Sequence, residues 1–297
     1  MAEHPIVSLS LANRPENLLV VRQALTGVAN GLAFDALAAN DLNTAVSEAC
    51  NNVVMHAYEG AEGPLVVEVC ALADAVAVIV RDHGCGMATG AQATGAGGDA
   101  EDHAGIGLPV ISALARRVDF SDVAGGGTAV RMEFAAPNAG SLGTLGEDRS
   151  ESSKRTADAH ADSVELRLAP SPLARAVLAR VLGTLAARVH FSTDRISDVQ
   201  MLADVLAANA ADSIDGSDLN VGVRLSPHAL ALRLWPLRSG GGESLLNSDT
   251  DGFAPIIERL TDERRVARAG AGEALELRLV DHPWDDNRWG LRLPPAG

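Results

Sequence analysis

Apolar and polar residues follow two different periods along the first half of the chain, and each period predicts a type of element. Apolar residues alternate with small polar ones over 7–11, and β-rich runs cover 65–72 and 75–81. A short turn through Asp74 joins the last two runs, which predicts an antiparallel hairpin. A further strand is expected over 128–134, after three consecutive glycines.

Helical spacing predicts the elements that lie between these strands. Asn13-Arg-Pro15-Glu16 is typical of a capped helix start, and the apolar residues that follow recur every three or four positions until Gly31. A second helix is expected from Asp35 or Asn40 to Ala57. Strands in a meander with helices grouped on one side predict an α+β fold, a two-layer sandwich. Domain one is expected to span 1–136.

The pattern stops after residue 136 and then begins again. Residues 137–163 are rich in Gly, Ser, Thr, Asp and Glu, which predicts a flexible linker. Residues 164–172 resemble residues 7–15, which lie 157 positions earlier: Val164-Glu-Leu-Arg-Leu-Ala-Pro-Ser-Pro172 compared with Val7-Ser-Leu-Ser-Leu-Ala-Asn-Arg-Pro15. We therefore expect one fold twice in tandem, the alternative being a chance resemblance between two small α+β domains. The second copy is expected over 164–280, with strands at 221–225, 230–235 and 275–279, a helix at 256–265, and a tail over 281–297.

Composition excludes several classes of function. Hydrophobic residues make up 47% and charged residues 21% of the chain, proportions typical of packed domains. The net charge of −15 argues against nucleic acid or an anionic membrane surface as a direct partner. The three cysteines show no C-x-x-C spacing, which favours a reducing compartment. The sequence shows no signal peptide with a basic and then an apolar segment, and no apolar run of about 20 residues that could span a membrane. We therefore predict a cytoplasmic protein.

A carboxylate and an amide occupy one face of the second predicted helix. Glu48 and Asn52 are four residues apart, so their side chains project together. A carboxylate can accept a proton from an attacking hydroxyl, and an amide oxygen can ligate Mg²⁺. Taken alone, this spacing is more typical of an ordinary solvated helix face.

Glycines surround an acidic residue at the end of the hairpin and return before a third helix. Asp82 follows a strand directly and can accept from the exocyclic amine of adenine, while Gly84 and Gly86 permit a close backbone approach. A plain surface turn is the alternative. Gly105 and Gly107 form a hinge at the start of a helix expected over 106–117, where backbone N–H groups would face a phosphate. Residues 88–104, between the two glycine groups, suit a nucleotide lid or an ordinary loop.

In this order, the motifs resemble the N, G1, G2 and G3 boxes of the Bergerat-fold ATPases, the superfamily of gyrase and the histidine kinases. Within it, the chain is similar to the small anti-sigma-factor serine kinases. The resemblance covers residues 7–135 and rests on Glu48-x-x-x-Asn52, Asp82-x-Gly84-x-Gly86, Gly105-Ile106-Gly107-Leu108 and Gly127-Thr128.

The resemblance implies a role for each matching residue. Glu48 would be the general base, Asn52 the Mg²⁺ ligand and Asp82 the adenine anchor. Arg22, on the first helix, would face a protein partner. The remaining residues would shape the ATP pocket or support its hydrogen bonds: Gly84, Gly86, Gly105, Ile106, Gly107, Leu108 and Thr128.

The second half lacks the acidic residues of these motifs. Val205 takes the place of Glu48, although Asn209 matches Asn52, and the turn Trp235–Gly242 has no acid for adenine. We expect this half to bind no ATP tightly and to serve as an internal pseudo-dimer partner, with a homodimer or an independent partner-binding module as alternatives.

These expectations combine into one principal hypothesis. The chain would use ATP and Mg²⁺ to phosphorylate a small antagonist (anti-anti-sigma) protein, and would otherwise hold a sigma factor. A non-catalytic ATP-binding switch and an ATPase of the same fold are the alternatives.

Overall fold

The computed structural model describes residues 4–86, 107–143, 162–216, 218–247, 256–270 and 272–281. The first half of the chain alternates strands and helices in the order expected for an α+β sandwich. Its elements are β1 (Val7–Ala12), α1 (Asn17–Gly31), α2 (Ala36–Asn52), the π-helical η1 (Val53–Ala57), β2 (Pro64–Ala71), β3 (Ala75–Asp82), α3 (Gly107–Leu114), β4 (Arg117–Asp122), β5 (Thr128–Ala135) and α4 (Gly140–Gly143).

The second half presents a similar order of elements. These are β6 (Ser163–Leu168), α5 (Pro172–Arg188), α6 (Thr193–Ser213), β7 (Leu219–Ser226), β8 (Ala229–Leu237), α7 (Gly241–Leu246), α8 (Ile256–Leu260), β9 (Glu263–Ala269) and β10 (Gly272–Val280). Within the described ranges, no helix combines the length and apolar character needed to cross a membrane.

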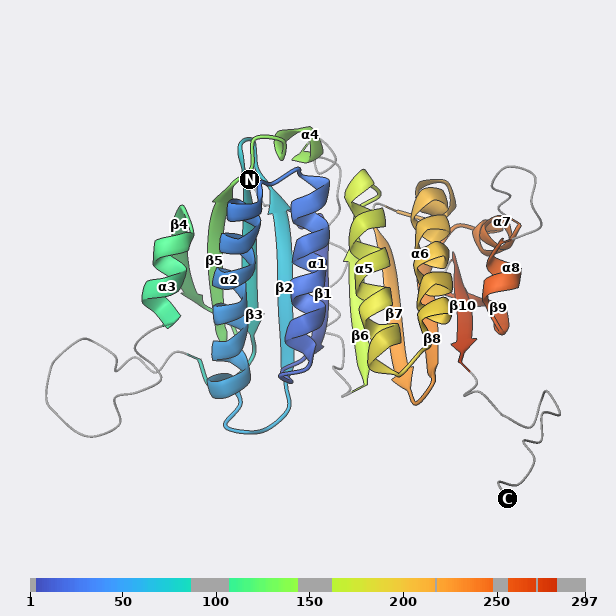
Figure 1. The fold of residues 1–297 in the computed structure, drawn as a ribbon, viewed down its shortest axis with the longest axis horizontal. Coiled ribbons are helices and arrows are strands. Elements are labelled where there is room, and N and C mark those ends of the chain that lie inside the picture. The colour runs from blue at the N-terminus through green and yellow to red at the C-terminus, as the bar shows by residue number, and fades with distance from the viewer. Residues whose placement is uncertain are drawn as a thin grey trace, which may run out of the picture.

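All strands join one continuous antiparallel sheet, and the long helices cover one of its faces (Figure 1). The strand order is β4-β5-β3-β2-β1-β6-β7-β8-β10-β9. Read outward from the centre, both halves place their strands in the same succession: first, second, third, fifth, fourth. The fold is therefore α+β as expected, and the two halves meet at their first strands.

The contact between the two halves follows a local two-fold relation. β1 and β6 pair antiparallel, and Leu9 lies opposite Leu166, its own counterpart at the offset of 157 residues. On the helical layer, Arg180 Nη1 donates to Gln23 Oε1 at 3.3 Å, and these two residues are again 157 apart. Contacts between equivalent residues are the geometry of an isologous interface. Residues that are 157 positions apart in the sequence are thus in contact where the two halves meet.

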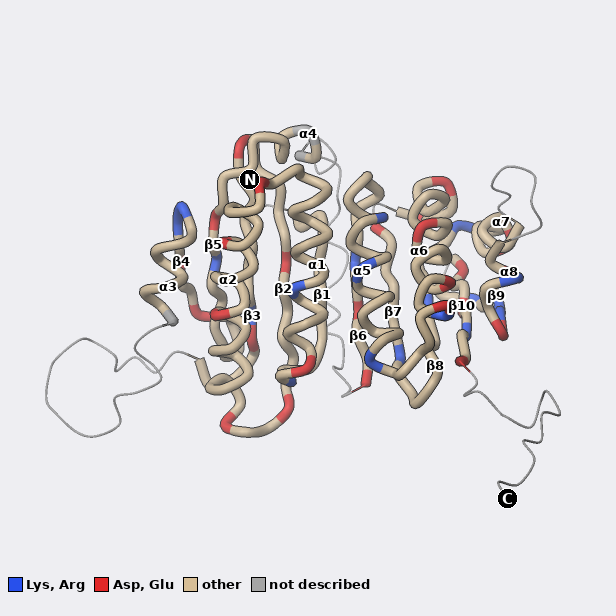
Figure 2. Tube along the Cα trace, in the orientation of Figure 1, with Lys and Arg blue, Asp and Glu red and all other residues tan. Residues whose placement is uncertain are grey.

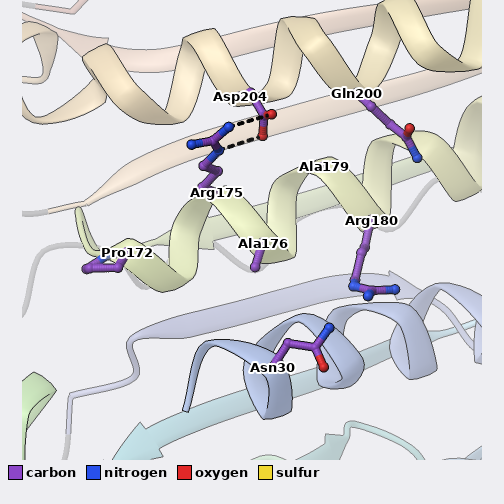
Figure 3. Close-up of a pocket in the computed structure, with 8 residues that line it drawn as sticks. All are labelled: Asn30, Pro172, Arg175, Ala176, Ala179, Arg180, Gln200 and Asp204. Atoms are coloured by element: carbon purple, nitrogen blue, oxygen red, sulfur yellow. Dashed lines mark hydrogen bonds and ion pairs between the residues drawn. The ribbon is translucent and has the colours of Figure 1, made fainter. Parts of the chain in front are cut away.

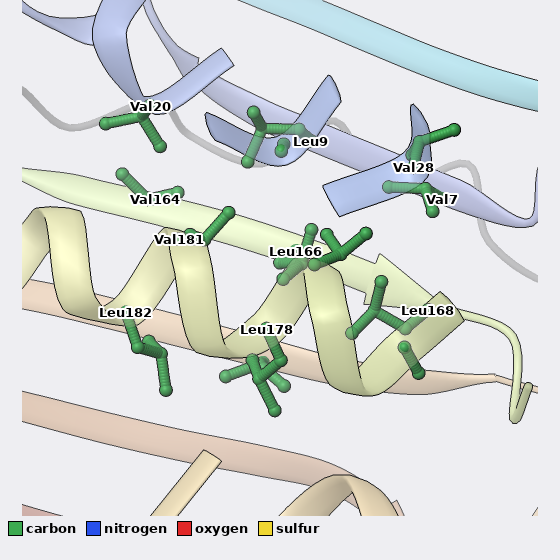
Figure 4. Packing of buried hydrophobic residues seen from close by; sticks show 14 of the residues in the cluster. Val7, Leu9, Val20, Val28, Val164, Leu166, Leu168, Leu178, Val181 and Leu182 are labelled. Atoms are coloured by element: carbon green, nitrogen blue, oxygen red, sulfur yellow. The ribbon is translucent and has the colours of Figure 1, made fainter. Parts of the chain in front are cut away.

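Close packing of α1 on α5 seals the junction. A Cβ added to Gly27 would lie 2.8 Å from Val177 Cα, so only glycine permits this approach of the helices. Figure 4 shows Leu9, Val20, Leu166 and Val181 converging beneath them. All four are buried in a hydrophobic core that extends without interruption from one half to the other. Removal of this much apolar surface from water holds the halves together.

Two strands were absent from the sequence expectation. The predicted helices over 106–117 and 256–265 end at Leu114 and Leu260, and the chain then continues as β4 and β9. Both strands form outer edges of the sheet and are largely exposed, so neither carries the apolar alternation of a half-buried strand. Hydrogen bonding to the neighbouring strands β5 and β10, rather than an apolar pattern in their own sequence, holds β4 and β9 in the extended conformation.

Local contacts also alter two expected boundaries. Asn13 does not cap α1: its side chain donates to Ala61 O and accepts from Gly63 N, which ties the helix entry to the loop before β2. The fold of the first half also continues into the expected linker, because α4 packs on it and buries Ala139 and Leu142. Residues 144–161 of that linker and the tail over 282–297 lie outside the described residues.

Candidate functional site

A buried carboxylate marks the end of β3. Asp82 is 4% exposed, and its Oδ1 accepts hydrogen bonds from the backbone N–H groups of Gly84, at 2.9 Å, and Thr128, at 3.2 Å. The same atom thus joins the β3 turn to the start of β5. No described residue donates to Oδ2, so this oxygen keeps its capacity to accept from a ligand.

Glycines allow the backbone to fold tightly around this carboxylate. Gly127 has a φ of +99°, and a Cβ there would overlap the carbonyl oxygen of Asp82. A Cβ on Gly84 would overlap the carbonyl oxygen of Ala57, to which Cys85 N donates at 2.9 Å. Gly86 has a φ of +76°. The turn after β3 is therefore held between η1 on one side and the β5 start on the other.

The single tyrosine of the chain fixes the position of this turn. Tyr58 Oη donates to Pro64 O at 2.6 Å and accepts from His83 N at 2.9 Å, so it bridges the start of β2 and the residue after Asp82. Burial raises the pKa of the Tyr58 phenol above its ordinary value, and the nearby Asp82 carboxylate adds to that shift. The hydroxyl consequently remains a hydrogen-bond donor over the ordinary pH range.

The helix α2 supplies the other two polar groups of the site. Asp35 caps it by accepting from Ala38 N, and α2 packs on β3 and β5 before continuing into η1. Glu48 and Asn52 are half-buried on this helix, and neither side chain bonds to any other described residue. Both groups, together with Asp82 Oδ2, thus retain unused hydrogen-bonding capacity on adjoining elements.

The remaining predicted residues fall into three groups. Gly107 and Leu108 begin α3, which packs against α2, and Leu108 is exposed. Gly105 and Ile106 lie outside the described residues, as does the lid over 88–104. Arg22 is exposed on α1, but its Nε donates at 2.9 Å to Ser47, the buried residue that precedes Glu48. This guanidinium therefore links α1 to the helix that carries Glu48 and Asn52.

The donor set suits a magnesium nucleotide in which phosphate and water supply most of the metal ligands. The described residues contain no cluster of three His, Cys, Asp or Glu side chains able to enclose a metal by themselves. One amide oxygen from Asn52 is compatible with Mg²⁺, which retains several waters and phosphate oxygens in nucleotide sites. A carboxylate at Asp82 that faces the main chain suits the amine edge of a purine.

At the corresponding place in the second half, the polar groups bond to other groups of the same half. The ladder register puts Pro236 where β3 has Asp82, and Val205 is buried. Asn209 donates back to the carbonyl of its own helix at 2.8 Å. The carboxylate of Glu273 accepts from the glycine loop, from Gly240 N at 3.0 Å and Gly242 N at 3.1 Å. These two hydrogen bonds lower the pKa of Glu273.

Sequence reasoning missed the groups that support Asp82. The hydrogen bond of Tyr58 to His83 and the close approach of Gly127 to the Asp82 carbonyl depend on contacts between segments that are far apart in the chain, as does the hydrogen bond of Ser47 with Arg22. The signals present were the His-Ala-Tyr sequence that ends the second helix and the glycine triplet before Thr128. Neither pattern specifies its partner.

Residues 11–134 match the family model of the histidine kinase-like ATPase domain. The serine-protein kinase RsbW of Bacillus pumilus is 34% identical over 82 residues, which are 27% of this chain and 51% of that protein. The serine-protein kinase RsbW of Listeria monocytogenes is 39% identical over 82 residues, 27% of this chain and 52% of its own. The chain thus spans about half the length of the curated relatives that it matches.

A solved structure described as crystal form III of TP0453 aligns over 94% of this chain and 92% of its own, with 8% identity and a TM-score of 0.34. Such a low score carries no argument about the fold. The match to the histidine kinase-like ATPase domain over residues 11–134 agrees with the resemblance that the motifs predict.

Proposed function

We propose that this chain, whose first half is a histidine kinase-like ATPase domain, is an ATP-dependent serine/threonine protein kinase that acts as an anti-sigma factor. The observation that carries the proposal is the buried Asp82 carboxylate, held by Gly84 and Thr128 with one oxygen left to accept. The similarity to serine-protein kinases over 82 residues supports phosphotransfer to a protein hydroxyl.

Three residues divide the work of the reaction. Asp82 accepts from the exocyclic amine of adenine and so distinguishes ATP from GTP, whose carbonyl at that position cannot donate. Asn52 would supply an oxygen ligand to Mg²⁺, and the bound cation would neutralise charge on the phosphates. Glu48, one helical turn before Asn52, takes the proton from the attacking serine or threonine hydroxyl. Closure over the nucleotide is assigned to the lid over 88–104, and phosphate binding to the glycines Gly105 and Gly107.

The partners follow from the same proposal. A small antagonist protein with a phosphorylatable hydroxyl is the substrate, and a sigma factor is the second partner. Phosphorylation of the antagonist dissociates it and leaves the kinase free to hold the sigma factor. The second half supplies the place of a second subunit, since it already covers the β1 edge and the α1 face of the first half.

A transfer assay with γ-labelled ATP tests this function. Purified full-length protein is incubated with Mg²⁺ and a panel of candidate antagonist proteins, and label on each protein is counted. The wild-type chain should label one antagonist, and Glu48→Gln should abolish that label. Asp41→Asn is the matched control, because Asp41 is a carboxylate seven residues earlier on the same helix.

Two results would contradict the kinase proposal. Labelled inorganic phosphate without a labelled protein would identify water as the acceptor and the chain as an ATPase. Tight ATP binding without turnover in the presence of the whole panel would identify a non-catalytic switch. Light scattering tests the assembly separately: a monomer is expected, and a stable homodimer through the first half would overturn the internal pairing.

A further inference from the structure

A shallow groove crosses the helical layer on both sides of α5. One hollow of about 470 Å³ lies between α1, α5 and α6, and Figure 3 shows Arg175, Arg180, Gln200 and Asn30 around it. A second hollow of about 600 Å³ extends from the same Arg180 and Gln200 toward the N-terminal end of α1. Because the two hollows share these residues, they form one continuous surface.

The second hollow exposes apolar surface that the fold does not cover. Leu19 on α1 is 55% exposed and lines this hollow. Pro15 and Ala187 line the same hollow and are also exposed. The Gln200 side chain covers Gly183 on α5, since a Cβ there would lie 2.9 Å from its amide nitrogen. A large exposed leucine among these apolar neighbours is a surface that accepts an apolar or aromatic side chain.

One cation in this groove lacks a carboxylate partner. α5 carries several arginines, visible along it in Figure 2, and two of them are already paired. Arg175 holds Asp204 through two hydrogen bonds, and Arg188 holds Glu16 at 3.4 Å. Arg180 bonds only the neutral Gln23, and no described carboxylate forms an ion pair with it. The groove therefore offers both an apolar surface and an unused positive charge.

The C-terminal segment leaves the fold at the same end of the helical layer. Asp281 accepts from Ser192 N at the start of α6, and its own N–H donates to His228 O at 2.9 Å. Gln200 is eight residues along α6 from Ser192, which is about 12 Å. Neighbouring helices pack about 8–10 Å apart. Eight extended residues from Asp281 to Trp289 reach about 27 Å, so this tryptophan can cross to the groove.

We propose that the C-terminal segment Trp284–Trp289 of the same chain docks in this groove. Its sequence, Trp-Asp-Asp-Asn-Arg-Trp, supplies the Trp289 indole for the apolar surface at Leu19 and two carboxylates, Asp285 and Asp286, for Arg180. A segment tethered at Asp281 has a high effective concentration at the groove, so docking needs little intrinsic affinity. The tail thereby occludes the surface above the junction of the two halves and competes with any protein that binds there.

Tryptophan fluorescence tests the docking directly. Of three tryptophans, two are in the tail and Trp235 is in β8, so Trp235→Phe leaves only tail reporters. Acrylamide quenching is measured for this variant alone and with Leu19→Glu or Leu37→Glu added. Leu37 is the control, because it is 71% exposed on α2 and outside the groove. Leu19→Glu should raise the quenching constant of the tail tryptophans, about twofold for Trp289, by releasing that indole, and Leu37→Glu should leave it unchanged.

A charge exchange tests the polar contact. Arg180→Glu should increase quenching, and adding Asp285→Arg with Asp286→Arg should restore protection, a coupling that a double-mutant cycle isolates. The chain that retains Trp235 should show the same changes with smaller amplitude. Tail tryptophans as accessible as free indole in the starting variant would overturn the proposal. So would equal responses to Leu19→Glu and Leu37→Glu, or protection that rises with protein concentration, which would indicate the tail of another copy.

Discussion

The two halves of the chain share a strand order and a helical layer, yet they differ at one end of the third strand. In the first half, Asp82 keeps an oxygen available, and Glu48 and Asn52 bond to no described side chain. In the second half, Asn209 bonds its own helix and Glu273 fills the glycine loop. A similar frame therefore supports a site with unused polar groups in the first half, and in the second half a surface whose polar groups bond to one another.

The difference teaches that the frame and the chemistry are specified by separate residues. The frame depends on apolar positions at the sheet and helix interfaces, which both halves retain in one core. The chemistry depends on a few polar groups whose hydrogen bonds are left incomplete within the chain, and such groups cost stability unless a ligand or water completes them. Variants at matched positions in the two halves can separate these contributions.

The largest expected effect is that of Gly127→Ala. The added Cβ would overlap the Asp82 carbonyl at a φ of +99°, so we expect a loss of about 3 kcal/mol in the free energy of unfolding. Nucleotide binding should be lost with it, because the Asp82 turn must move. Denaturant unfolding followed by circular dichroism measures the first effect.

Gly125→Ala is the matched control for that experiment. Gly125 has a similar φ of +96° but faces open space, so its substitution should cost only about 1 kcal/mol of backbone strain and leave nucleotide binding intact. Equal losses for the two variants would show that strain alone, rather than the contact with Asp82, governs this turn.

Asn52→Ala and Asn209→Ala compare the two halves at equivalent positions. Removal of the Asn52 amide should weaken Mg²⁺-dependent ATP binding about 100-fold, since a metal ligand is lost. Asn209→Ala should leave the ATP affinity unchanged, because the Asn209 side chain donates to Val205 O. Calorimetric titration of both variants with ATP, with and without Mg²⁺, gives the values. An equal response from Asn209→Ala would place a working site in the second half.

Tyr58→Phe should have a smaller effect, about 1 kcal/mol, from loss of the hydrogen bonds to Pro64 and His83. The raised pKa of Tyr58 adds a pH dependence. The folded phenol stays neutral at a pH where the unfolded one ionises, so its contribution is complete below the unfolded pKa and declines as the pH rises through the folded pKa. Because the chain has one tyrosine, its phenolate absorbance titrates this group alone. A midpoint at or below that of a model tyrosine would contradict the buried geometry.

Glu273→Gln should give the smallest effect, and it should depend on pH in the opposite direction. The folded pKa of Glu273 is lowered by Gly240 and Gly242, so its ionised form stabilises the fold above the unfolded pKa, and this contribution is lost as the pH falls through the folded pKa. The stability difference from wild type should therefore shrink below about pH 4. Glu276→Gln, on the same strand, is the control. A difference that persists unchanged into acid would show that the glycine loop does not depend on this charge.

Sequence patterns predicted the elements that bury an apolar face, and they failed where burial is slight. The stripe Leu42, Val46 and Ala49 on α2 is buried as its spacing predicts. The edge strands β4 and β9 lack such a stripe, and the sequence pattern predicts no strand at either position. Polar residues behaved similarly: the hydrogen bonds of Asn13 to Ala61 and Gly63 are contacts that no local pattern contains.

In the candidate site, too, some residues could be predicted from the sequence and others could not. Glu48, Asn52 and Asp82 were identified by spacing and by their resemblance to a known family, and the structure places them on adjoining elements. The supporting contacts of Tyr58 and Arg22 arise only when distant segments pack together. Helix and strand periods carry information about burial, whereas these hydrogen bonds depend on tertiary geometry.

The pairing of Gln23 with Arg180 at the local two-fold has a consequence for which halves associate. Two copies of the second half, joined in the same way, would set one guanidinium against another and incur like-charge repulsion. A mixed pair sets the cation against a neutral amide and avoids that repulsion. The junction thus discriminates against association of one chain's second half with that of another, which limits exchange of halves between neighbouring molecules during synthesis and folding.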